Sequence, residues 1–596
     1  MASYQAPLDD IRFVAHDLLD LTGHYPGLRE IEAPDRETFD MMLEQGGRFS
    51  EQVLHPLYRS GDETGCDFNG GNVKLPPGYR EAREQWVQAG WPGLTAAVRW
   101  GGQALPRSVG IAINEMLCAV NPPWVMLVGL PSGVMMAIDA HGADWQRERF
   151  FPGLVDGRFS ATMCLTEPHC GTDLGILRSK AEPQADGTYK ISGTKIFISY
   201  GEHDCSENII HLVLAKLPDA PAGSAGISMF IVPKFMVNED QSLGERNAVS
   251  CGSIEHKMGY AASPTCVMNF DGATGYMVGE PHQGLKYMFV MMNDARIGSG
   301  MAGLGLANAS YQGALNYARE RLQMRSLSGP KNKDGAADPI IVHPGVRQLL
   351  LTQKAFTEGC RALCLDAARY GDLAEYGADQ EIRKAASRRL GFLTPIVKGF
   401  VTEVSNECVS HGVQVLGGHG YIREHGMEQL MRDCRVSTIY EGTTQVQALD
   451  LIGRKIMLDQ GQAMRDLIAE IDVFCEGLES HARVAAEAKA LRAKLSEWQQ
   501  LAAEVGVAAM KNPDEAGAAS VDFLMYSGYV VVGWYWLRLV LAAERKLAAG
   551  GDADFCNGKC KAAAFYFARL FPRTLALAAT IRAGADSMMG IVEVEF

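Results

Sequence analysis

The chain has 596 residues, which is enough for about four domain-sized units. Apolar residues make up 47% of it, as expected for a globular protein with several buried cores. Its 70 acidic residues outnumber 56 basic ones, and no basic tract occurs, so the net charge of −14 argues against a nucleic-acid-binding protein.

The cysteines indicate packing rather than metal or redox chemistry. All 14 are scattered, without a CxxC pair or a Cys/His cluster at metal-ligand spacing, so no metal site is expected. Cys360 and Cys364 are four apart on an expected helix, which is typical of a helix core. This usage indicates a reduced compartment. The amino terminus has early acids and no apolar h-region, so no signal peptide is expected.

Residues 1–160 are predicted to form an N-terminal helical domain. In DDIRFVAHDLLDL, acids precede apolar residues at helical spacing, and DRETFDMMLEQGGRF and SVGIAINEMLCAV continue this pattern. From 161 to 285 the pattern changes to short β-rich runs, such as TYKISGTKIFIS and GISMFIVPKF, with turn signals between them. Strands without intervening helices predict a middle antiparallel β-domain.

Helices are predicted again from 286 to 465, as a helical bundle, and from 466 to 596, as an additional and separate C-terminal helical domain. The glycines of GSGMAGLGLAN lie within a helical pattern, which favours helix packing over phosphate binding. Residues 326–345 are rich in Pro, Gly and charge and should form an exposed loop. The apolar run FLMYSGYVVVGWYWL is short for a membrane span, so a buried helix is expected, with membrane-surface contact as the alternative. The fold class is therefore α+β, mostly α.

Three polar stretches are candidates for chemistry. The first, CLTEPHCGTDLG, supplies hydroxyls at the entry to the β-domain, although Pro and Gly also mark a structured turn. In the second, GTKIFISYGEHD, Phe197 and Ser199 are two apart on a strand and should share a face. The third runs from 414 to 447 and contains IYEGTTQVQ. Its Glu441 is either a charge in the first turn of a helix or a catalytic base.

Together these stretches resemble the acyl-CoA dehydrogenase family. TEPxxG(S/T)D, K(x)(W/F)I(S/T), Q(x)xGGxG and MRD…IYEGT(x)QxQ occur in the family's order between about 40 and 460. The length resembles bacterial members near 600 residues with an extra C-terminal domain. The resemblance implies an FAD enzyme that removes hydrogens from Cα and Cβ of an acyl-CoA thioester and leaves a trans-2-enoyl-CoA.

The resemblance identifies Glu441 as the base that takes the Cα proton, while N5 of FAD takes the Cβ hydride. A carboxylate in a dry, apolar site has the raised pKa that such a base needs. In some relatives the base comes from the position before the arginine of a motif equivalent to NDAR, but here that position is Ala295. This departure favours Glu441.

Other site residues are carried over from the family's motifs. Arg321 and Gln323 come from ERLQMRS, where Met324-Arg325 replaces the usual Phe-Gly, and Gln414 belongs to a flavin diphosphate contact made across a subunit boundary. His169 and Cys170 fall at variable positions, where loop packing or a role in specificity is open. The expected cofactor-binding residues are Leu165, Thr166, Phe197, Ser199, Arg321, Gln323, Gln414, Gly417, Gly418, Thr443 and Gln445. The expected substrate-binding residues are Thr172, Asn293, Arg296, Tyr440 and Gly442.

The resemblance leaves the substrate and the electron acceptor open. A medium- or long-chain fatty acyl-CoA of β-oxidation is the first expectation, and 3-methylmercaptopropionyl-CoA is the alternative. The Met and Trp residues of 114–133 either form the floor of the substrate pocket or pack in a hydrophobic core. The expected acceptor is an electron-transfer flavoprotein; an oxidase that uses oxygen and a non-catalytic acyl-CoA-binding protein are the alternatives. A bacterial cytoplasmic homo-oligomer, with a dimer favoured, is expected, without a transmembrane segment.

Overall fold

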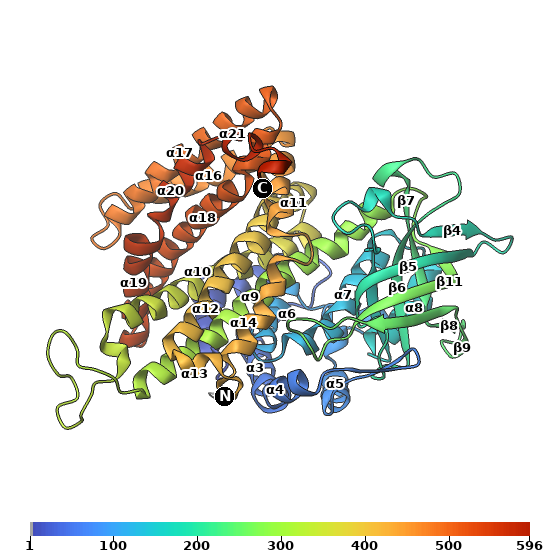
Figure 1. Cartoon of the computed structure of the whole chain (residues 1–596), viewed down its shortest axis with the longest axis horizontal. Helices are drawn as coiled ribbons and strands as arrows, with labels where there is room; N and C mark the ends of the chain where they lie inside the picture. Colours follow the sequence, from blue (N-terminus) through green and yellow to red (C-terminus); the bar gives the residue numbers. More distant parts are fainter. Residues whose placement is uncertain (1–3) are drawn as a thin grey trace.

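The computed structural model describes residues 4–596, and its central element is the long helix α9 (Gly284–Glu320). In Figure 1 the β-domain lies at one end of the molecule, the helical bundle around α9 in the middle, and the C-terminal helices at the other side. This arrangement confirms the expected fold class of helical domains around a middle β-domain.

The N-terminal part is helical, with one addition that the sequence analysis missed. A small hairpin pairs β1 (Asp67–Asn69) with β2 (Asn72–Lys74). Its strands are too short to show alternation, and only Gly70-Gly71, both with positive φ, marks the turn. The main helices are α1 (Leu8–Arg12), α3 (Arg36–Phe49), α4 (His55–Thr64), α5 (Tyr79–Gln88), α6 (Arg107–Val120), α7 (Pro122–His141) and α8 (Asp144–Val155).

The β-domain is a seven-stranded sheet in the order β10-β11-β5-β4-β6-β3, and β7 pairs with both β11 and β6, so the ladder closes on itself. Most pairs are antiparallel, but β3 runs parallel to β6. β4 also has one parallel residue pair with β6. The antiparallel domain is thus as predicted apart from these two pairings, which local pattern does not reveal because pairing direction depends on the chain's path between strands. The strands are β3 (Phe159–Cys164), β4 (Lys180–Pro183), β5 (Tyr189–Ser199), β6 (Asn208–Lys216), β7 (Ile227–Pro233), β10 (Val249–Ile254) and β11 (Thr265–Met277), with a separate pair β8 (Phe235–Val237) and β9 (Leu243–Arg246).

The glycines of α9 allow close helix packing, as the sequence predicts. A Cβ on Gly305 would lie 2.7 Å from the backbone of α6, and one on Gly300 would lie 2.7 Å from Val397. Across this bundle, Arg361 and Glu115 form a fully buried, two-pronged ion pair. The other bundle elements are α10 (Pro344–Tyr376), α11 (Gln380–Ile396), the π-helical turn η9 (Val397–Val401), α12 (Thr402–Leu416), α14 (Met427–Arg435), α15 (Thr444–Leu449) and η12 (Asp450–Leu458).

The hydrophobic core of the C-terminal helices is continuous with that of the bundle. Residues of α18 (Asp514–Ala548) belong to the same hydrophobic cluster as residues of α10 and η9. The additional C-terminal helices thus pack directly on the bundle, because one apolar face of α18 is buried against it. The remaining helices here are α16 (Gln462–Glu476), α17 (Ala485–Lys511), α19 (Ala553–Phe565), α20 (Arg573–Ile581) and α21 (Asp586–Met589).

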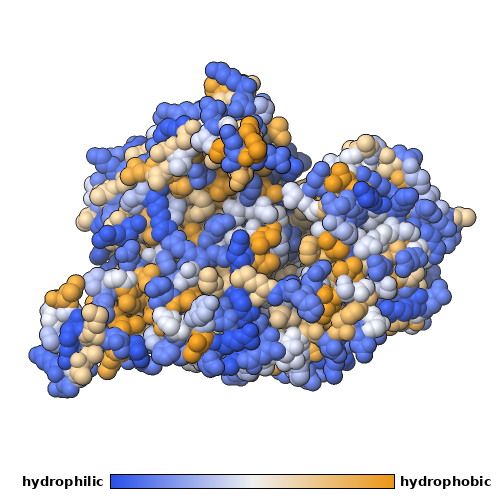
Figure 2. Space-filling view, viewed as in Figure 1, coloured by the Kyte–Doolittle hydropathy of each residue, from blue (hydrophilic) through white to orange (hydrophobic). Residues whose placement is uncertain are grey.

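Two helices, α7 and α18, are long and apolar enough to cross a membrane by length and composition alone. In α18, however, 83% of the apolar window is buried inside the protein, and in α7 half of it is. Burial of this extent confirms the predicted core helix at 523–537. The space-filling view shows hydrophilic side chains over most of this face and a notch between the helical part and the β-domain (Figure 2).

Candidate active site

Glu441 lies in a tight turn that precedes α15, not in the helix itself. Glu441 and Gly442 both have positive φ, of 56° and 87°, and Thr443 is the N-cap of α15. The Gln447 amide donates hydrogen bonds to the carbonyl oxygens of Glu441 (3.1 Å) and Gly442 (3.3 Å). Positive φ at a glutamate is strained backbone that its surroundings must hold in place. The interpretation of Glu441 as a first-turn helix charge is therefore wrong.

Gln447 is a site residue that the sequence analysis missed. It is fully buried in α15, and its amide is what fixes the Glu441 turn. The only signal in the sequence is a polar residue at a position of α15 where burial is expected, six residues after the glutamate. That signal becomes specific only when the turn is seen in three dimensions.

The electrostatic surroundings of Glu441 suit a general base. Burial raises the pKa of its carboxyl to about 7, against the opposing effect of Arg296 and Lys398, whose positive charges face it. No described residue donates a hydrogen bond to the carboxylate, so its lone pairs stay free. A pKa near 7 and a free oxygen are the two properties that proton abstraction near neutral pH requires.

Arg296 is a buried cation beside this glutamate. Its guanidinium lies 3.8 Å from the Asp450 carboxylate and donates a hydrogen bond to the side-chain oxygen of Asn293 (3.2 Å). Asn293 is itself a predicted substrate contact. Burial lowers the pKa of Arg296, and the carboxylates of Asp450 and Glu441 oppose that shift. The structure thus brings three predicted site residues, Asn293, Arg296 and Glu441, together.

Tyr440, a further predicted substrate contact, has hydroxyl groups as neighbours. Burial raises the pKa of its phenol, and Ser299 and Tyr260 are hydrogen-bonding neighbours that oppose the shift. Tyr260 is held in turn by buried Asp433, which accepts hydrogen bonds from its backbone N–H (2.6 Å) and from the Tyr58 hydroxyl (2.7 Å). The aspartate of the MRD motif therefore orders the residues that neighbour Tyr440 and Glu441.

The first two motifs meet in the β-domain. Lys195 on β5 is fully buried and donates to the Leu165 carbonyl (3.0 Å) and to Glu167 (2.8 Å). The backbone N–H of Ile196 donates to the Thr166 carbonyl (2.9 Å). These bonds fix the loop that carries Leu165 and Thr166 beside the strand that carries Phe197 and Ser199.

Phe197 has the features of a ring that packs on a planar ligand. Its side chain is 60% exposed, and its backbone has a φ of 59° next to a register shift between β5 and β11. No described residue forms a hydrogen bond with the side-chain hydroxyl of Thr166 or Ser199. An exposed aromatic ring with two free hydroxyls nearby fits a flavin ring system. Thr172, the predicted CoA contact, is exposed at the rim of this loop.

The same loop also places Glu167, His169 and Cys170 within metal-ligand distance of one another. Burial raises the pKa of Glu167, but Lys195 and the hydrogen bonds from Ser179 and from the Arg178 backbone lower it to about 2. Both carboxylate oxygens are thus already used as acceptors. This favours the loop-packing interpretation over a metal site.

The residues predicted to contact the flavin diphosphate lie at the far end of α9. At 1.5 Å per residue, this helix separates Arg296 from Arg321 by roughly 37 Å. Tyr317, one turn before Arg321, forms a 2.7 Å hydrogen bond with His419, which brings the Gly417-Gly418 turn to the same end. The predicted residues at this far end are all exposed: Arg321, Gln323, Gln414, Gly417 and Gly418. Met324, at the departure from the family motif, is 77% exposed and has positive φ.

Gln445 and Thr443 already have partners inside the chain. The Gln445 amide donates to Ser520 (3.1 Å) and to the Gly517 carbonyl (3.4 Å) of α18. Thr443 accepts a hydrogen bond from the Val446 N–H as a helix cap. A flavin contact by either side chain would compete with these bonds.

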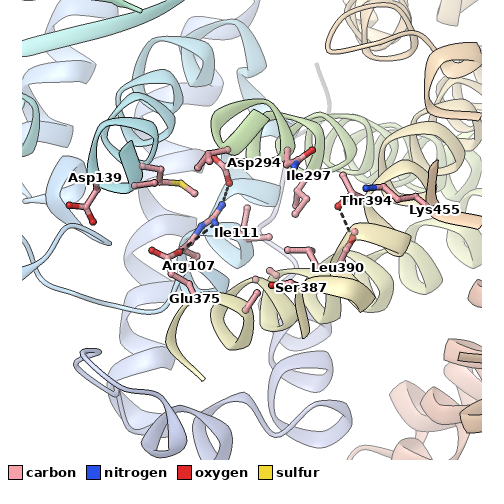
Figure 3. A pocket seen from close by; sticks show the side chains of 18 of the residues that line it. Arg107, Ile111, Asp139, Asp294, Ile297, Glu375, Ser387, Leu390, Thr394 and Lys455 are labelled. Carbon is pink, nitrogen blue, oxygen red and sulfur yellow. Dashed lines mark hydrogen bonds and ion pairs between the residues drawn. The ribbon is translucent and has the colours of Figure 1, made fainter. Parts of the chain in front are cut away.

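A cavity of about 570 Å³ opens between α6, α7, α9, α10, α11 and η12 (Figure 3). Predicted contact Asn293 lines it, as do Asp450 and Thr394, so the cavity extends close to the Arg296–Asp450 pair. Figure 3 shows Arg107 directed towards Asp294 and Glu375, which neutralise it. The apolar lining comes from Ile111, Met136, Val290, Ile297 and Leu390. Trp124, in contrast, is fully buried in the core, as expected for most of 114–133.

Family models match nearly the whole chain. They are the acyl-CoA dehydrogenase N-terminal domain (36–158), middle domain (162–273) and C-terminal domain (282–457), and the acetyl-CoA dehydrogenase C-terminal-like domain (467–591). The chain therefore belongs to the acyl-CoA dehydrogenase family, whose enzymes are FAD-dependent oxidoreductases acting on CH–CH groups.

Two full-length relatives place the chain within that family. It is 42% identical to the 3-methylmercaptopropionyl-CoA dehydrogenase of Ruegeria pomeroyi, over 98% of this chain and 99% of the relative. It is 32% identical to the broad-specificity linear acyl-CoA dehydrogenase of Mycobacterium tuberculosis, over the whole of both chains.

Solved structures share the fold. Caenorhabditis elegans ACDH-11 in complex with C11-CoA has a TM-score of 0.77 at 17% identity, covering 99% of this chain and 96% of that one. A Bacillus anthracis acyl-CoA dehydrogenase complexed with FAD has a TM-score of 0.74 at 20% identity, covering 94% and 91%.

Proposed function

We propose that the protein catalyses FAD-dependent α,β-dehydrogenation of an acyl-CoA thioester to the trans-2-enoyl-CoA. The observation that carries this proposal is Glu441, a carboxylate without hydrogen bonds whose pKa is raised by burial to about 7. It would take the Cα proton, and Ala295 leaves no competing base at the alternative position. A non-catalytic acyl-CoA-binding protein would not need this strained turn.

FAD, when bound, supplies the hydride acceptor for the Cβ hydrogen. The residues that would hold its ring system are Phe197, through its exposed ring, and Thr166 and Ser199, through their free hydroxyls. Lys195 and Glu167 keep this surface in place by tying the loop to β5.

The charges around the cavity favour an uncharged part of the substrate. Four carboxylates line it, from Asp139, Asp294, Glu375 and Asp450, against two cations, Arg107 and Lys455. This balance disfavours the CoA diphosphate there and suits the pantetheine or acyl arm. The hydroxyls of Tyr260, Tyr440 and Ser299 near the base would also tolerate a slightly polar acyl group.

The substrate is proposed to be a linear acyl-CoA, with fatty acyl chains and 3-methylmercaptopropionyl-CoA as the two kinds to be compared. The relative at 42% identity carries the second name, and the relative at 32% identity is named for broad specificity towards linear acyl groups. Neither name alone decides between them, because chain length depends on side chains from several helices.

A homo-oligomer, with a dimer favoured, is proposed as the working form in the bacterial cytoplasm. The exposed residues predicted to contact a flavin diphosphate lie at the far end of α9, roughly 37 Å from Arg296. A flavin held beside Glu441 would have to span that distance to use them in the same chain. If the far end of α9 in a second copy contacts the first copy's flavin, the flavin does not have to span this distance within one chain.

The decisive experiment mixes the purified, flavin-loaded protein anaerobically with acyl-CoA thioesters of increasing length and with 3-methylmercaptopropionyl-CoA. Loss of the flavin absorbance with at least one of them is expected, and the fastest compound identifies the substrate. If no thioester bleaches the flavin, the proposed function is wrong. Electron-transfer flavoprotein is the proposed acceptor; peroxide release equal to substrate consumption in air would instead identify an oxidase.

A further inference from the structure

Lys398 is a buried cation that the family's motifs do not explain. It lies in the π-helical turn η9, its side chain is fully buried, and its ammonium group has no hydrogen-bond partner among the described residues. A buried, unpaired ammonium is strongly destabilising unless neighbouring charges compensate it. π-Helical turns within longer helices are frequently found at functional sites.

The turn η9 packs against α9, α12 and α15, and the charged groups that act on Lys398 come from these elements. Glu441 lies on the turn before α15, Glu403 on α12 and Arg296 on α9. Glu403 is half-exposed and already accepts a 2.5 Å hydrogen bond from Thr444. Glu441 is therefore the carboxylate in this group that has no hydrogen bond of its own. Burial lowers the pKa of Lys398 to about 8, and the two glutamates oppose that shift.

The C-terminal helices hold Lys398 in this position. A Cβ on Gly528 of α18 would lie 2.1 Å from the ring of Phe400, and one on Gly399 would lie 2.7 Å from Leu524 of α18. On the opposite side, Gly300 of α9 packs against Val397. The turn η9 is thus clamped between α9 and α18, and α18 also accepts the hydrogen bond from Gln445, four residues after Glu441.

We propose that Lys398 is a positioning residue for the catalytic base: its buried ammonium keeps the Glu441 carboxylate ionised, and α18 holds the ammonium in place. This inference rests on the proposed role of Glu441 as the base. A charge that acts across space stabilises the carboxylate without occupying its lone pairs, so an oxygen stays free for the Cα proton. A hydrogen-bonded lysine would stabilise the same charge but weaken the base.

The test is the pH dependence of kcat/KM for anaerobic flavin bleaching, which reports the pKa of the base in the free enzyme. Removal of the charge in Lys398→Met should raise that pKa by about one pH unit. Bleaching at pH 6.5 should then fall about 10-fold, whereas at pH 9 it should recover to near the wild-type value. Lys398→Arg, which keeps the charge, should restore the wild-type profile at least in part.

Two further variants keep the outcome unambiguous. Lys384→Met removes an exposed lysine of α11 that pairs with Glu381, and its profile should match the wild type. Glu403→Gln removes the competing carboxylate and should shift the pKa of the base in the opposite direction, to lower pH. It tests the inference even if Lys398→Met does not fold.

An equal loss of activity at every pH in Lys398→Met, or an unshifted profile in both Lys398→Met and Glu403→Gln, would overturn the inference. These outcomes are distinct from failure of the proposed function, which would appear as absence of bleaching in the wild-type protein itself.

Discussion

The two ends of α9 differ in the burial of their charged groups, in hydrogen bonding and in backbone strain. At the Arg296 end, the side chains of Arg296 and Lys398 are buried with nitrogens that have no hydrogen-bond partner among the described residues, and the backbone of Glu441 is strained. At the Arg321 end, the predicted contacts are exposed polar side chains and glycines. The buried end has the features needed for proton transfer within one chain, whereas the exposed end offers a surface that only a bound ligand or a second copy would complete.

The largest expected effect is at the buried end. Glu441→Gln should lower kcat/KM by roughly 10³-fold or more, because it removes the general base. The bound flavin should be retained, since its proposed ring contacts lie on the β-domain and its proposed diphosphate contacts at the far end of α9. Absorbance spectra and steady-state rates check both statements. Glu381→Gln on the exposed start of α11 is the control, and full activity in Glu441→Gln would show that the base lies elsewhere.

A smaller and different effect is expected at the exposed end. Replacing Arg321 and Gln414 together by Ala should lower the flavin retained after gel filtration by about 10-fold, because a charge-assisted diphosphate contact is lost. Activity should return in excess FAD, since the base is untouched. Arg319→Ala, on the exposed last turn of α9, is the matched control. Unchanged flavin content in the double variant would exclude this end as a flavin contact.

Variants at the two ends of α9 should also differ in how their thermal stability depends on pH. Burial raises the pKa of Glu441 from 4.5 to about 7, so the folded state binds this proton more tightly than the unfolded state. That contribution to stability is complete below about pH 4.5 and is lost as the pH rises to about 7. Glu441→Gln cannot titrate, so its Tm relative to the wild type should rise between about pH 5 and pH 8.

Thermal unfolding of both proteins at the two pH values measures this difference. The Arg321/Gln414 variant serves as the control, because exposed groups should give a difference in Tm that does not change with pH. An equal Tm difference for Glu441→Gln at both pH values would show that the carboxyl is well solvated in the folded protein.

Much of the fold could be read from local pattern. The helices, the β-rich middle and the end of α12 at Gly417 follow from periodicity and from backbone preferences of single residues. The hairpin at 67–74 and the parallel pairing of β3 were not accessible in this way. Short strands carry no periodic signal, and strand direction depends on the path of the chain between strands.

Some residues of the candidate site were likewise predicted from the sequence, whereas others were found only in the structure. The sequence by itself pointed to Glu441, to Phe197 and Ser199 as expected flavin contacts, and to the packing glycines of α9, because each belongs to a motif or a period. Only the tertiary structure brought Gln447 to the strained turn and the η9 turn that carries Lys398 against α9 and α18. These roles depend on contacts between residues far apart in the chain and on burial, which sets the pKa of Glu441 and which no local pattern encodes.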